Sequence, residues 1–157
     1  MKNKPIICKI KDDYIKYMYS FDSNIYYNKN EQRPYLGILF YVNDLNYYAP
    51  LSSPKEKHEK MKESIKYEKV CDGRLGLVNL SNMLPVPDSV IIKFDINQSE
   101  NKNLYLSQLR YFKKNYTKIQ KKANKLYSLV TSGNKGLMVN CCNYLLLEKK
   151  LLEYTFC

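Results

Sequence analysis

The chain has 157 residues, of which 45% are hydrophobic, and its 26 Lys and Arg against 15 Asp and Glu give a formal net charge of +11. This length suits one folded domain, residues 1–157, and no apolar run approaches the roughly 20 residues of a membrane-spanning helix. The excess charge predicts a polyanionic partner, most simply a nucleic acid, with a membrane surface as the weaker alternative. Because the N-terminus has no signal-peptide pattern, we expect a cytoplasmic protein whose five cysteines are free thiols.

Six short stretches predict strands because they are rich in β-branched and aromatic residues. In chain order they cover residues 6–10, 35–42, 45–51, 65–71, 75–80 and 89–94. Asn43-Asp44 and Asp72-Gly73 are turn signals that join two pairs of these strands as hairpins, and the apolar run 35–42 should be the central strand. Since no strand–helix–strand rhythm occurs, we expect a small curled antiparallel sheet or barrel.

Hydrophobic spacing and turn signals predict helices over residues 14–21, 55–62, 105–130 and 142–154. In the first helix, the side chains expected to face the core are Tyr14, Tyr17, Met18 and Phe21. In the last helix, which should close the sheet, they are Leu145, Leu146, Leu151 and Leu152.

The long third helix should have an apolar face and a basic face. Apolar residues recur every three or four positions from Tyr105 to Val130 and should be buried. The basic face carries Lys114, Lys118, Lys121, Lys122 and Lys125. These lysines form either a solvated helix face or a basic ridge along a nucleic-acid groove.

The most informative segment, residues 47–58, contains two prolines, Pro50 and Pro54. A strand-like run ends at Pro50, and Ser52, Ser53 and Lys55 follow it. Because each proline fixes φ and favours extended backbone in the residue before it, the segment should be a stiff corner. Such a corner can hold hydroxyl groups and an ammonium around one phosphate, although it could also be a turn with solvated lysines.

The polar, Asn-rich stretch 22–32 is typical of a loop. Tyr26 and Tyr27 lie in it, and Arg33 follows it. The tyrosine rings either anchor the loop to the body of the protein or stack on bases, which loops are well placed to do.

The sequence disfavours a metal-dependent nuclease or a nucleotide-driven enzyme. It has no Gly-rich phosphate loop and no carboxylate cluster for Mg²⁺, and with His58 as the single histidine a zinc site is not expected. Metal-free RNA cleavage remains open, because the ribose 2′-OH is then the nucleophile. Lys55 with Ser52 and Ser53 could stabilise the phosphate charge, and Lys55 or His58 could transfer protons, although His58 could also be exposed or cap a helix.

Four sets of residues, in order along the chain, match the motifs of a known family. They are Arg33-Pro34-Tyr35-Leu36-Gly37-Ile38; Tyr48-Ala49-Pro50-Leu51-Ser52-Ser53-Pro54-Lys55 with His58; Leu75-Gly76-Leu77-Val78-Asn79-Leu80 with Met83-Leu84-Pro85-Val86; and Gln108-Leu109 with Phe112, and Cys142-Asn143-Tyr144 with Leu147-Glu148. Through them nearly the whole chain resembles the ToxN/AbiQ family, the endoribonuclease toxins of type III toxin–antitoxin systems.

This resemblance implies an α+β fold, a Kid/MazF-like (SH3-like) antiparallel β-barrel with added helices that include a long C-terminal helical pair. It implies metal-independent RNA cleavage that leaves a 2′,3′-cyclic phosphate and needs no cofactor. The implied partner is a small repeated antitoxin RNA, which the toxin cuts into pseudoknot units and which inhibits it in a closed toxin–RNA hetero-oligomer. Cellular or phage mRNA would be the substrate, and phage defence by abortive infection the biological role.

The resemblance also implies site residues. The family's catalytic positions correspond to Lys55, Ser53 with Ser52 beside it, and Arg33, and we assign the family's loop tyrosine to Tyr27. His58 is a further catalytic candidate, and Lys57 joins the lysines of the third helix as a predicted RNA contact. The alternatives are a catalytically silent RNA-binding module and a basic structural or membrane-surface protein.

Overall fold

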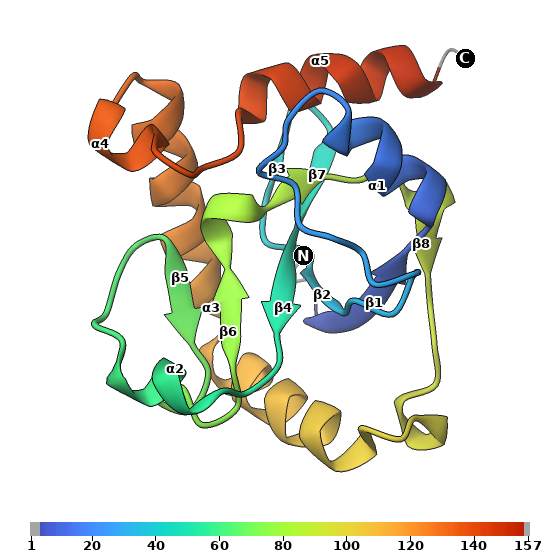
Figure 1. Cartoon of the computed structure of the whole chain (residues 1–157), viewed down its shortest axis with the longest axis vertical. Helices are drawn as coiled ribbons and strands as arrows, with labels where there is room; N and C mark the ends of the chain where they lie inside the picture. Colours follow the sequence, from blue (N-terminus) through green and yellow to red (C-terminus); the bar gives the residue numbers. More distant parts are fainter. Residues whose placement is uncertain (1–3, 156–157) are drawn as a thin grey trace.

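The computed structural model describes residues 4–155. Its strands are β1 (Ile6–Ile10), β2 (Tyr35–Gly37), β3 (Tyr41–Val42), β4 (Leu45–Ser52), β5 (Tyr67–Lys69), β6 (Leu77–Asn79), β7 (Leu84–Pro85) and β8 (Ile91–Ile92). Its helices are α1 (Asp12–Tyr19), α2 (Glu56–Lys60), α3 (Lys102–Thr131), α4 (Lys135–Met138) and α5 (Tyr144–Thr155). The fold is therefore a mixture of helices and an antiparallel sheet, as the sequence predicts (Figure 1).

The strands form one sheet in the order β5-β6-β4-β2-β1-β8, and β3 and β7 pair with β4 outside this path. The long strand β4 changes partners along its length, because Asn46 pairs with β3, Tyr47 with β7, Pro50 with β2 and Ser52 with β6. Within residues 4–155 the end strands β5 and β8 do not pair with each other. The sheet is open, so the expected closed barrel is not confirmed.

The apolar run 35–42 is two short strands, β2 and β3, and not the single central strand that its composition predicts. Between them, the carbonyl of Ile38 accepts hydrogen bonds from the side chains of Tyr116 and Gln120 on α3. The helix thus binds a backbone group that a neighbouring strand would otherwise pair with. An apolar pattern contains no sign of this interruption.

Both predicted hairpin turns are confirmed. Asn43 and Asp44 turn β3 into β4 with φ of 50° and 63°, and the turn from β5 to β6 contains Asp72 and Gly73 with φ of 56° and 93°. The predicted strand 89–94 is confirmed only at β8, because a 3-10 turn precedes it.

The helix α1 ends at Tyr19, and its first turn contains Asp12 and Asp13, where carboxylates suit the helix dipole. Tyr14 and Met18 are buried as predicted. Phe21 lies beyond the end of the helix and is 39% exposed, so its predicted place in the core is wrong.

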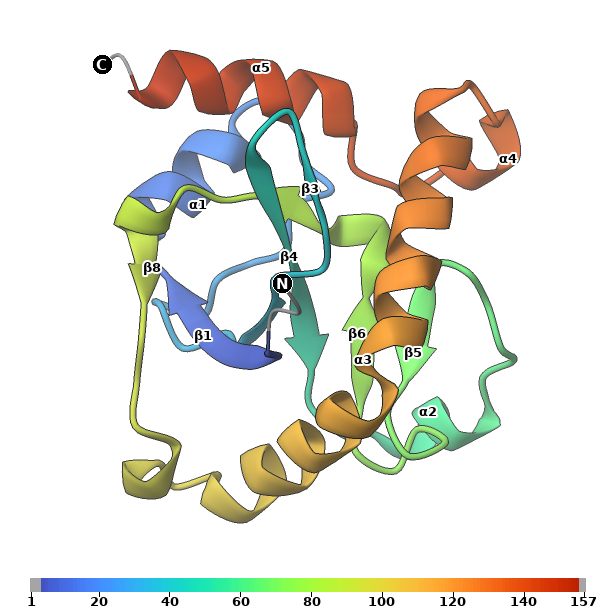
Figure 2. The same ribbon diagram turned by 180° about the vertical axis from the view of Figure 1, so that it is seen from behind.

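The helix α3 runs behind the sheet in Figure 1 and in front of it in Figure 2, whereas α5 and α1 lie together at one end. The predicted apolar face of α3 is confirmed. Its buried side chains include Tyr105, Phe112, Tyr116, Ile119, Ala123, Leu126 and Val130. One face of the sheet is thus covered by a single long helix.

The helix α5 buries only part of the predicted face, because Leu151 is buried as predicted but two other leucines are not. Leu145 and Leu152 are 54% and 52% exposed, which corrects the prediction for both. Tyr144 fixes the rotation of the helix, because its ring stacks on that of Tyr127 with the centroids 5.6 Å apart. The buried side chains of the helix include Tyr144, Leu147 and Leu151.

The cysteines that the structure describes, Cys8, Cys71, Cys141 and Cys142, are free, and Cys157 lies outside the described residues. No helix within residues 4–155 is long and apolar enough to cross a membrane.

Candidate active-site cleft

Residues from the end of β4, the start of α2, the β5–β6 hairpin and the loop before β2 line a cleft of about 450 Å³. We call it the Lys55 cleft. Of the residues predicted from the sequence, it is lined by Arg33, Ser52, Lys55, Lys57 and His58. Residues more than 20 positions apart in the chain thus come together around one cavity.

The backbone of the segment that carries Ser52 and Lys55 is held by two glycines of the β5–β6 turn. A Cβ added to Gly76 would lie 2.1 Å from the carbonyl oxygen of Ser52, and one added to Gly73 would lie 2.5 Å from that of His58. Both glycines also have positive φ, of 97° and 93°. Only glycine fits such positions, so the turn packs directly against the corner that bears the candidate catalytic groups.

His58 holds Lys55 from within the cleft wall. Its side chain is 2% exposed, and its Nδ1 accepts a hydrogen bond of 3.1 Å from the backbone N–H of Lys55. Burial, together with the charges of Lys57 and Lys55, lowers the pKa of the imidazole below its ordinary value. The ring is therefore neutral near pH 7, with its proton on Nε2.

Asn79 orients the hydroxyl of Ser52. Its Nδ2 donates to Ser52 Oγ at 2.9 Å and to the carbonyl oxygen of Pro50 at 3.0 Å. Because Oγ accepts this hydrogen bond, the Ser52 hydroxyl can donate its own proton to a group in the cleft. Asn79 lies in a matched motif, but sequence reasoning assigned no role to it.

Arg33 is a buried cation with part of its hydrogen-bonding capacity unused. Its Nε donates to the carbonyl oxygen of Tyr27 at 2.6 Å, and its Nη1 donates to that of Leu51 at 3.0 Å. Its Cζ lies 4.9 Å from the centroid of the Tyr26 ring. A guanidinium has five N–H donors and stays charged, so the remaining donors can serve an anion in the cleft.

Two of the predicted catalytic residues do not line the cleft. Ser53 is exposed in the segment between β4 and α2. Tyr27 is 69% exposed and lines a neighbouring pocket with Tyr19 and Tyr26, and of the two adjacent tyrosines only Tyr26 also lines the Lys55 cleft. The contact between Tyr26 and Arg33 distinguishes the two adjacent tyrosines, and sequence spacing could not reveal it.

The cleft is strongly cationic. Arg33, Lys55, Lys57 and Lys66 line it. Burial, followed by the charges of Arg33 and Lys55, lowers the pKa of the Lys29 ammonium. No Asp or Glu is among the described residues that line it. The same residues 4–155 contain no cluster of three His, Cys, Asp or Glu that could hold a metal ion. This combination suits a phosphate group.

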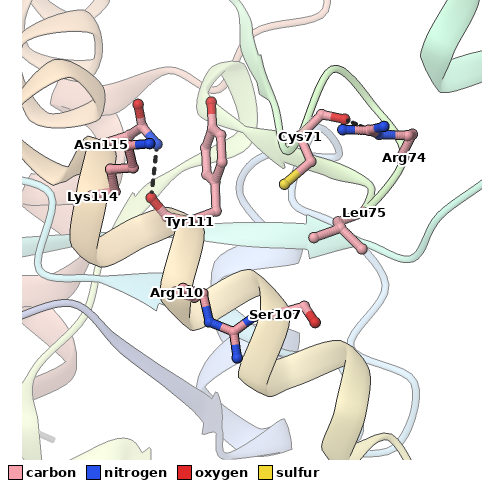
Figure 3. Close-up of a pocket in the computed structure, with 8 residues that line it drawn as sticks. All are labelled: Cys71, Arg74, Leu75, Ser107, Arg110, Tyr111, Lys114 and Asn115. Carbon is pink, nitrogen blue, oxygen red and sulfur yellow. Dashed lines mark hydrogen bonds between the residues drawn. The ribbon is translucent and has the colours of Figure 1, made fainter.

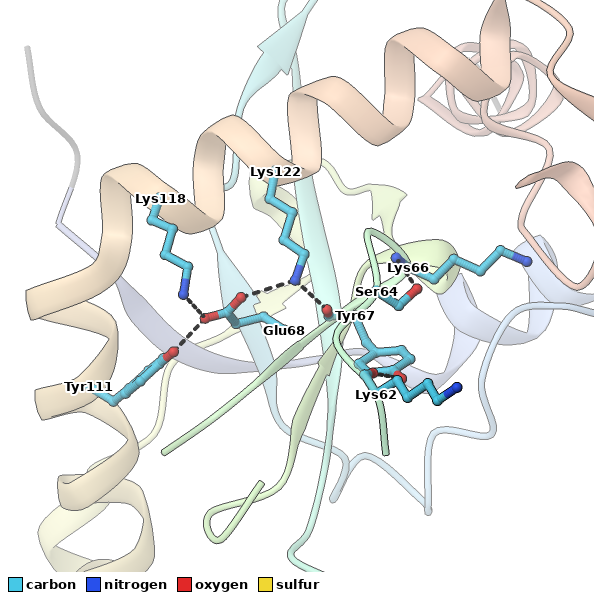
Figure 4. A network of polar contacts seen from close by, with 8 residues as sticks. All are labelled: Lys62, Ser64, Lys66, Tyr67, Glu68, Tyr111, Lys118 and Lys122. Carbon is cyan, nitrogen blue, oxygen red and sulfur yellow. Dashed lines mark hydrogen bonds and ion pairs between the residues drawn. The ribbon is translucent and has the colours of Figure 1, made fainter. Parts of the chain in front are cut away.

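The predicted lysine ridge of α3 is divided. Lys114 lines a separate pocket between α3 and the β5–β6 turn (Figure 3), and Lys121 and Lys125 are exposed. Lys118 and Lys122 instead form ion pairs of 3.3 and 3.2 Å with Glu68 of β5 (Figure 4). Part of the ridge therefore fastens α3 to the sheet.

Glu68 is a buried carboxylate at the centre of this contact, with 1% of its surface exposed. Tyr111 of α3 donates a hydrogen bond to it, and Lys122 also donates to the carbonyl oxygen of Tyr67 at 2.6 Å. Burial alone would raise the pKa of Glu68, but the hydrogen bond from Tyr111 and the two lysines outweigh it and lower the pKa. The carboxylate is thus charged and fully partnered near pH 7.

Comparison with known proteins gives the chain a family. The family described as "Toxin ToxN, type III toxin-antitoxin system" matches residues 6–152. Endoribonuclease ToxN of Bacillus thuringiensis subsp. kurstaki is 32% identical over 98% of this chain and 86% of its own length. Endoribonuclease ToxN of Pectobacterium atrosepticum is 31% identical over 92% of this chain and 91% of its own length. Endoribonuclease AbiQ of Lactococcus lactis subsp. lactis is 31% identical over 93% of this chain and 87% of its own length.

Solved structures agree with this. One, described as selective toxin inhibition by a non-coding RNA pseudoknot, superposes with a TM-score of 0.86 at 31% identity and covers 98% of this chain and 99% of its own. The structure of AbiQ, described as a lactococcal anti-phage endoribonuclease, has a TM-score of 0.86 at 28% identity and covers 99% and 100%. The chain belongs to the ToxN family of toxins from type III toxin–antitoxin systems, whose curated relatives above are endoribonucleases.

Proposed function

We propose that this ToxN-family chain is a sequence-specific endoribonuclease that cuts RNA in the Lys55 cleft without a metal ion. The observation that carries the proposal is the convergence of Arg33, Ser52 and Lys55 in a cationic cleft that no described carboxylate lines. In the proposed step the ribose O2′ attacks the adjacent phosphorus and forms a P–O2′ bond. The P–O5′ bond breaks, which leaves a 2′,3′-cyclic phosphate on one product and a 5′-hydroxyl on the other.

Each group has a proposed role in this step. The ammonium of Lys55 and the guanidinium of Arg33 stabilise the negative charge that develops on the pentacoordinate phosphorus, and the Ser52 hydroxyl donates to a phosphate oxygen. Ser53 contributes a second hydroxyl from the exposed side of the same corner. We place the family's loop tyrosine at Tyr26 and not at Tyr27, because Tyr26 lines the cleft and packs on Arg33.

The protonation state of His58 limits which groups can transfer protons. Its Nδ1 already accepts the N–H of Lys55, so a neutral ring offers only an Nε2–H donor and suits a positioning role better than that of a base. The Lys55 ammonium can supply a proton to O5′, whereas the Ser53 hydroxyl or one of the substrate's own groups takes the proton from O2′.

The partner that fits this site is a small repeated antitoxin RNA. One related structure is described as toxin inhibition by an RNA pseudoknot, and another, with a TM-score of 0.78 at 30% identity over 92% of this chain, as a processed non-coding RNA that regulates a bacterial antiviral system. By analogy, the chain would cut its antitoxin RNA into pseudoknot units that fill the cleft in a closed toxin–RNA assembly. Released toxin would then cut cellular or phage mRNA and act in phage defence by abortive infection.

Incubation of the purified chain with end-labelled RNA in excess EDTA tests the proposal. We expect cuts whose 3′ ends resist phosphatase until acid opens the cyclic phosphate. Cleavage that requires added Mg²⁺, or that leaves a 3′-hydroxyl, contradicts the mechanism. Tight binding of RNA that stays intact points instead to a silent RNA-binding module.

A further inference from the structure

The three arginines of the chain are distributed unevenly. Among 26 Lys and Arg, only Arg33, Arg74 and Arg110 are arginines. Arg33 lines the Lys55 cleft, and both others line a second pocket of about 670 Å³ between α3 and the turn from β5 to β6 (Figure 3). We call it the Arg74–Arg110 pocket. A lysine-rich chain thus has each of its arginines in one of two cavities.

The lining of this pocket suits an anion. One wall is a single face of α3, and the other is the hairpin turn. The lining residues are Cys71, Arg74, Leu75, Ser107, Arg110, Tyr111, Lys114 and Asn115. They include three cations, two hydroxyls and an amide but no carboxylate, so the charged side chains that line the pocket all favour an anionic group.

The cations of the pocket are available to a ligand. Within the part of the chain that the structure describes, no ion pair involves Arg74, Arg110 or Lys114. Arg74 Nε donates to the carbonyl oxygen of Cys71 at 3.2 Å, which orients its guanidinium and leaves the two terminal nitrogens available. A planar guanidinium can bind a phosphate through two parallel hydrogen bonds, which an ammonium cannot do.

A basic path connects this pocket to the Lys55 cleft. Met61, Lys66 and Tyr67 border that cleft. Glu63, Ser64 and Ile65 of the same loop border a third pocket, in which three lysines, Lys121, Lys122 and Lys125, outnumber the one carboxylate. Lys118, which is paired with Glu68 but 63% exposed, and Lys114 continue along α3 to the Arg74–Arg110 pocket. Along the helix, Lys125 and Arg110 are about 22 Å apart, roughly the length of six or seven phosphates along one strand of a duplex.

We propose that the Arg74–Arg110 pocket binds a backbone phosphate of RNA, outside the nucleotides that occupy the Lys55 cleft. The inference rests on the proposed function in one respect, that RNA is the ligand of the cleft, because the basic path between the pockets makes RNA the ligand that reaches both. The pocket would therefore distinguish a long or folded RNA from a short one. We assign the pocket no part in the cleavage chemistry or in the sequence preference of the Lys55 cleft.

The test measures RNA binding in a Lys55→Ala background, so that binding is read independently of cleavage. Arg74→Ala/Arg110→Ala is compared with Lys93→Ala/Lys149→Ala, which removes the same charge from exposed residues outside the three pockets. Each protein is titrated with an RNA of about 5 nucleotides and one of about 25 nucleotides, over a range of salt concentrations. Thermal unfolding checks that each variant is folded.

We expect the arginine variant to lower the salt slope of log Kd for the long RNA by about 1, with a loss confined to that RNA. The lysine control should change it less. Equal effects of the two double variants, or equal effects on the two RNAs, would refute the proposed phosphate site, because net charge alone would then explain the RNA binding. Because binding is measured without cleavage, metal-dependent or absent cleavage refutes the proposed mechanism but not the pocket. A chain that binds neither RNA refutes both.

Discussion

At the scale of single residues, the cleft is organised by side chains that hold the candidate catalytic groups. His58 holds the backbone of Lys55, Asn79 orients Ser52, and Arg33 fastens the loop before β2 to the end of β4. Each supporting contact joins segments that lie apart in the chain or fixes one geometry of a short corner. Residue type and spacing indicated Lys55 as a candidate, because a cation next to a stiff corner is visible in the sequence, whereas the catalytic assignment of Arg33 came from the resemblance to the family.

Other residues of the cleft could not be found in this way. Asn79 is the last residue of the short strand β6, where a polar residue is ordinary, and its role depends on the register that places it beside Ser52. The choice between Tyr26 and Tyr27 depends on which ring packs on Arg33. Both are tertiary contacts, so a single sequence contains no local signal for them.

His58 should make stability depend on pH. Because its pKa in the folded state lies below the ordinary value of 6.5, the unfolded chain binds the proton more readily, and stability falls as the pH drops through that value. In His58→Asn, the Asn Oδ1 can still accept the N–H of Lys55 but does not titrate. We expect urea unfolding to show a smaller loss between pH 7.5 and pH 5.5 for the variant than for the wild type. Equal losses would show that His58 does not contribute.

At the scale of elements, the β5–β6 turn supports the catalytic corner. Because backbone packs on backbone, any side chain at Gly76 would displace the segment that carries Ser52 and Lys55. The turn itself was predicted from Asp72-Gly73, but its packing partner was not. The same limit applies to α5, where the rotation is set by aromatic stacking of Tyr144 and not by the leucine pattern.

Gly76→Ala is expected to lower the free energy of unfolding by more than about 3 kcal/mol, because strain at positive φ adds to the clash with the Ser52 carbonyl. Gly133→Ala is the matched control, since Gly133 has φ of 96° but nothing within 4 Å of an added Cβ. It should cost only about 1–2 kcal/mol. Chemical denaturation gives both values, and RNA cleavage should fall in the first variant alone. Equal costs would mean that the close packing is unimportant.

Removal of two neighbouring lysines of α3 should affect different properties, because Lys122 supports the fold and Lys121 is a predicted RNA contact. Lys122→Ala leaves buried Glu68 without its closer, 16%-exposed partner and should cost about 1–3 kcal/mol of stability. Lys121→Ala removes an exposed cation and should change stability by less than about 0.5 kcal/mol, while lowering the salt slope of RNA binding by about 0.7. Unfolding and binding titrations on both variants decide this. The division fails if Lys122→Ala is as stable as the wild type.

At the scale of the whole molecule, charge and fold act together. The net charge of +11 predicted a polyanionic partner, and the structure gathers cations into the Lys55 cleft and along α3. The mixed α+β class and the apolar face of α3 followed from periodicity. Periodicity could not distinguish a closed barrel from an open sheet. Closure depends on whether the end strands β5 and β8 pair, and the sequence pattern of short strands is the same in both cases.

The central claim is that Lys55 lies at the centre of RNA cleavage. The most direct measurement is the single-turnover cleavage rate of Lys55→Ala in EDTA, beside Lys60→Ala, which removes an exposed lysine of α2 that does not line the cleft. We expect Lys55→Ala to lose at least about 100-fold in rate, as for loss of one transition-state donor, with an unchanged unfolding transition. Lys60→Ala should cut at the wild-type rate. If Lys55→Ala cuts RNA as fast as the wild type, the catalytic centre lies elsewhere.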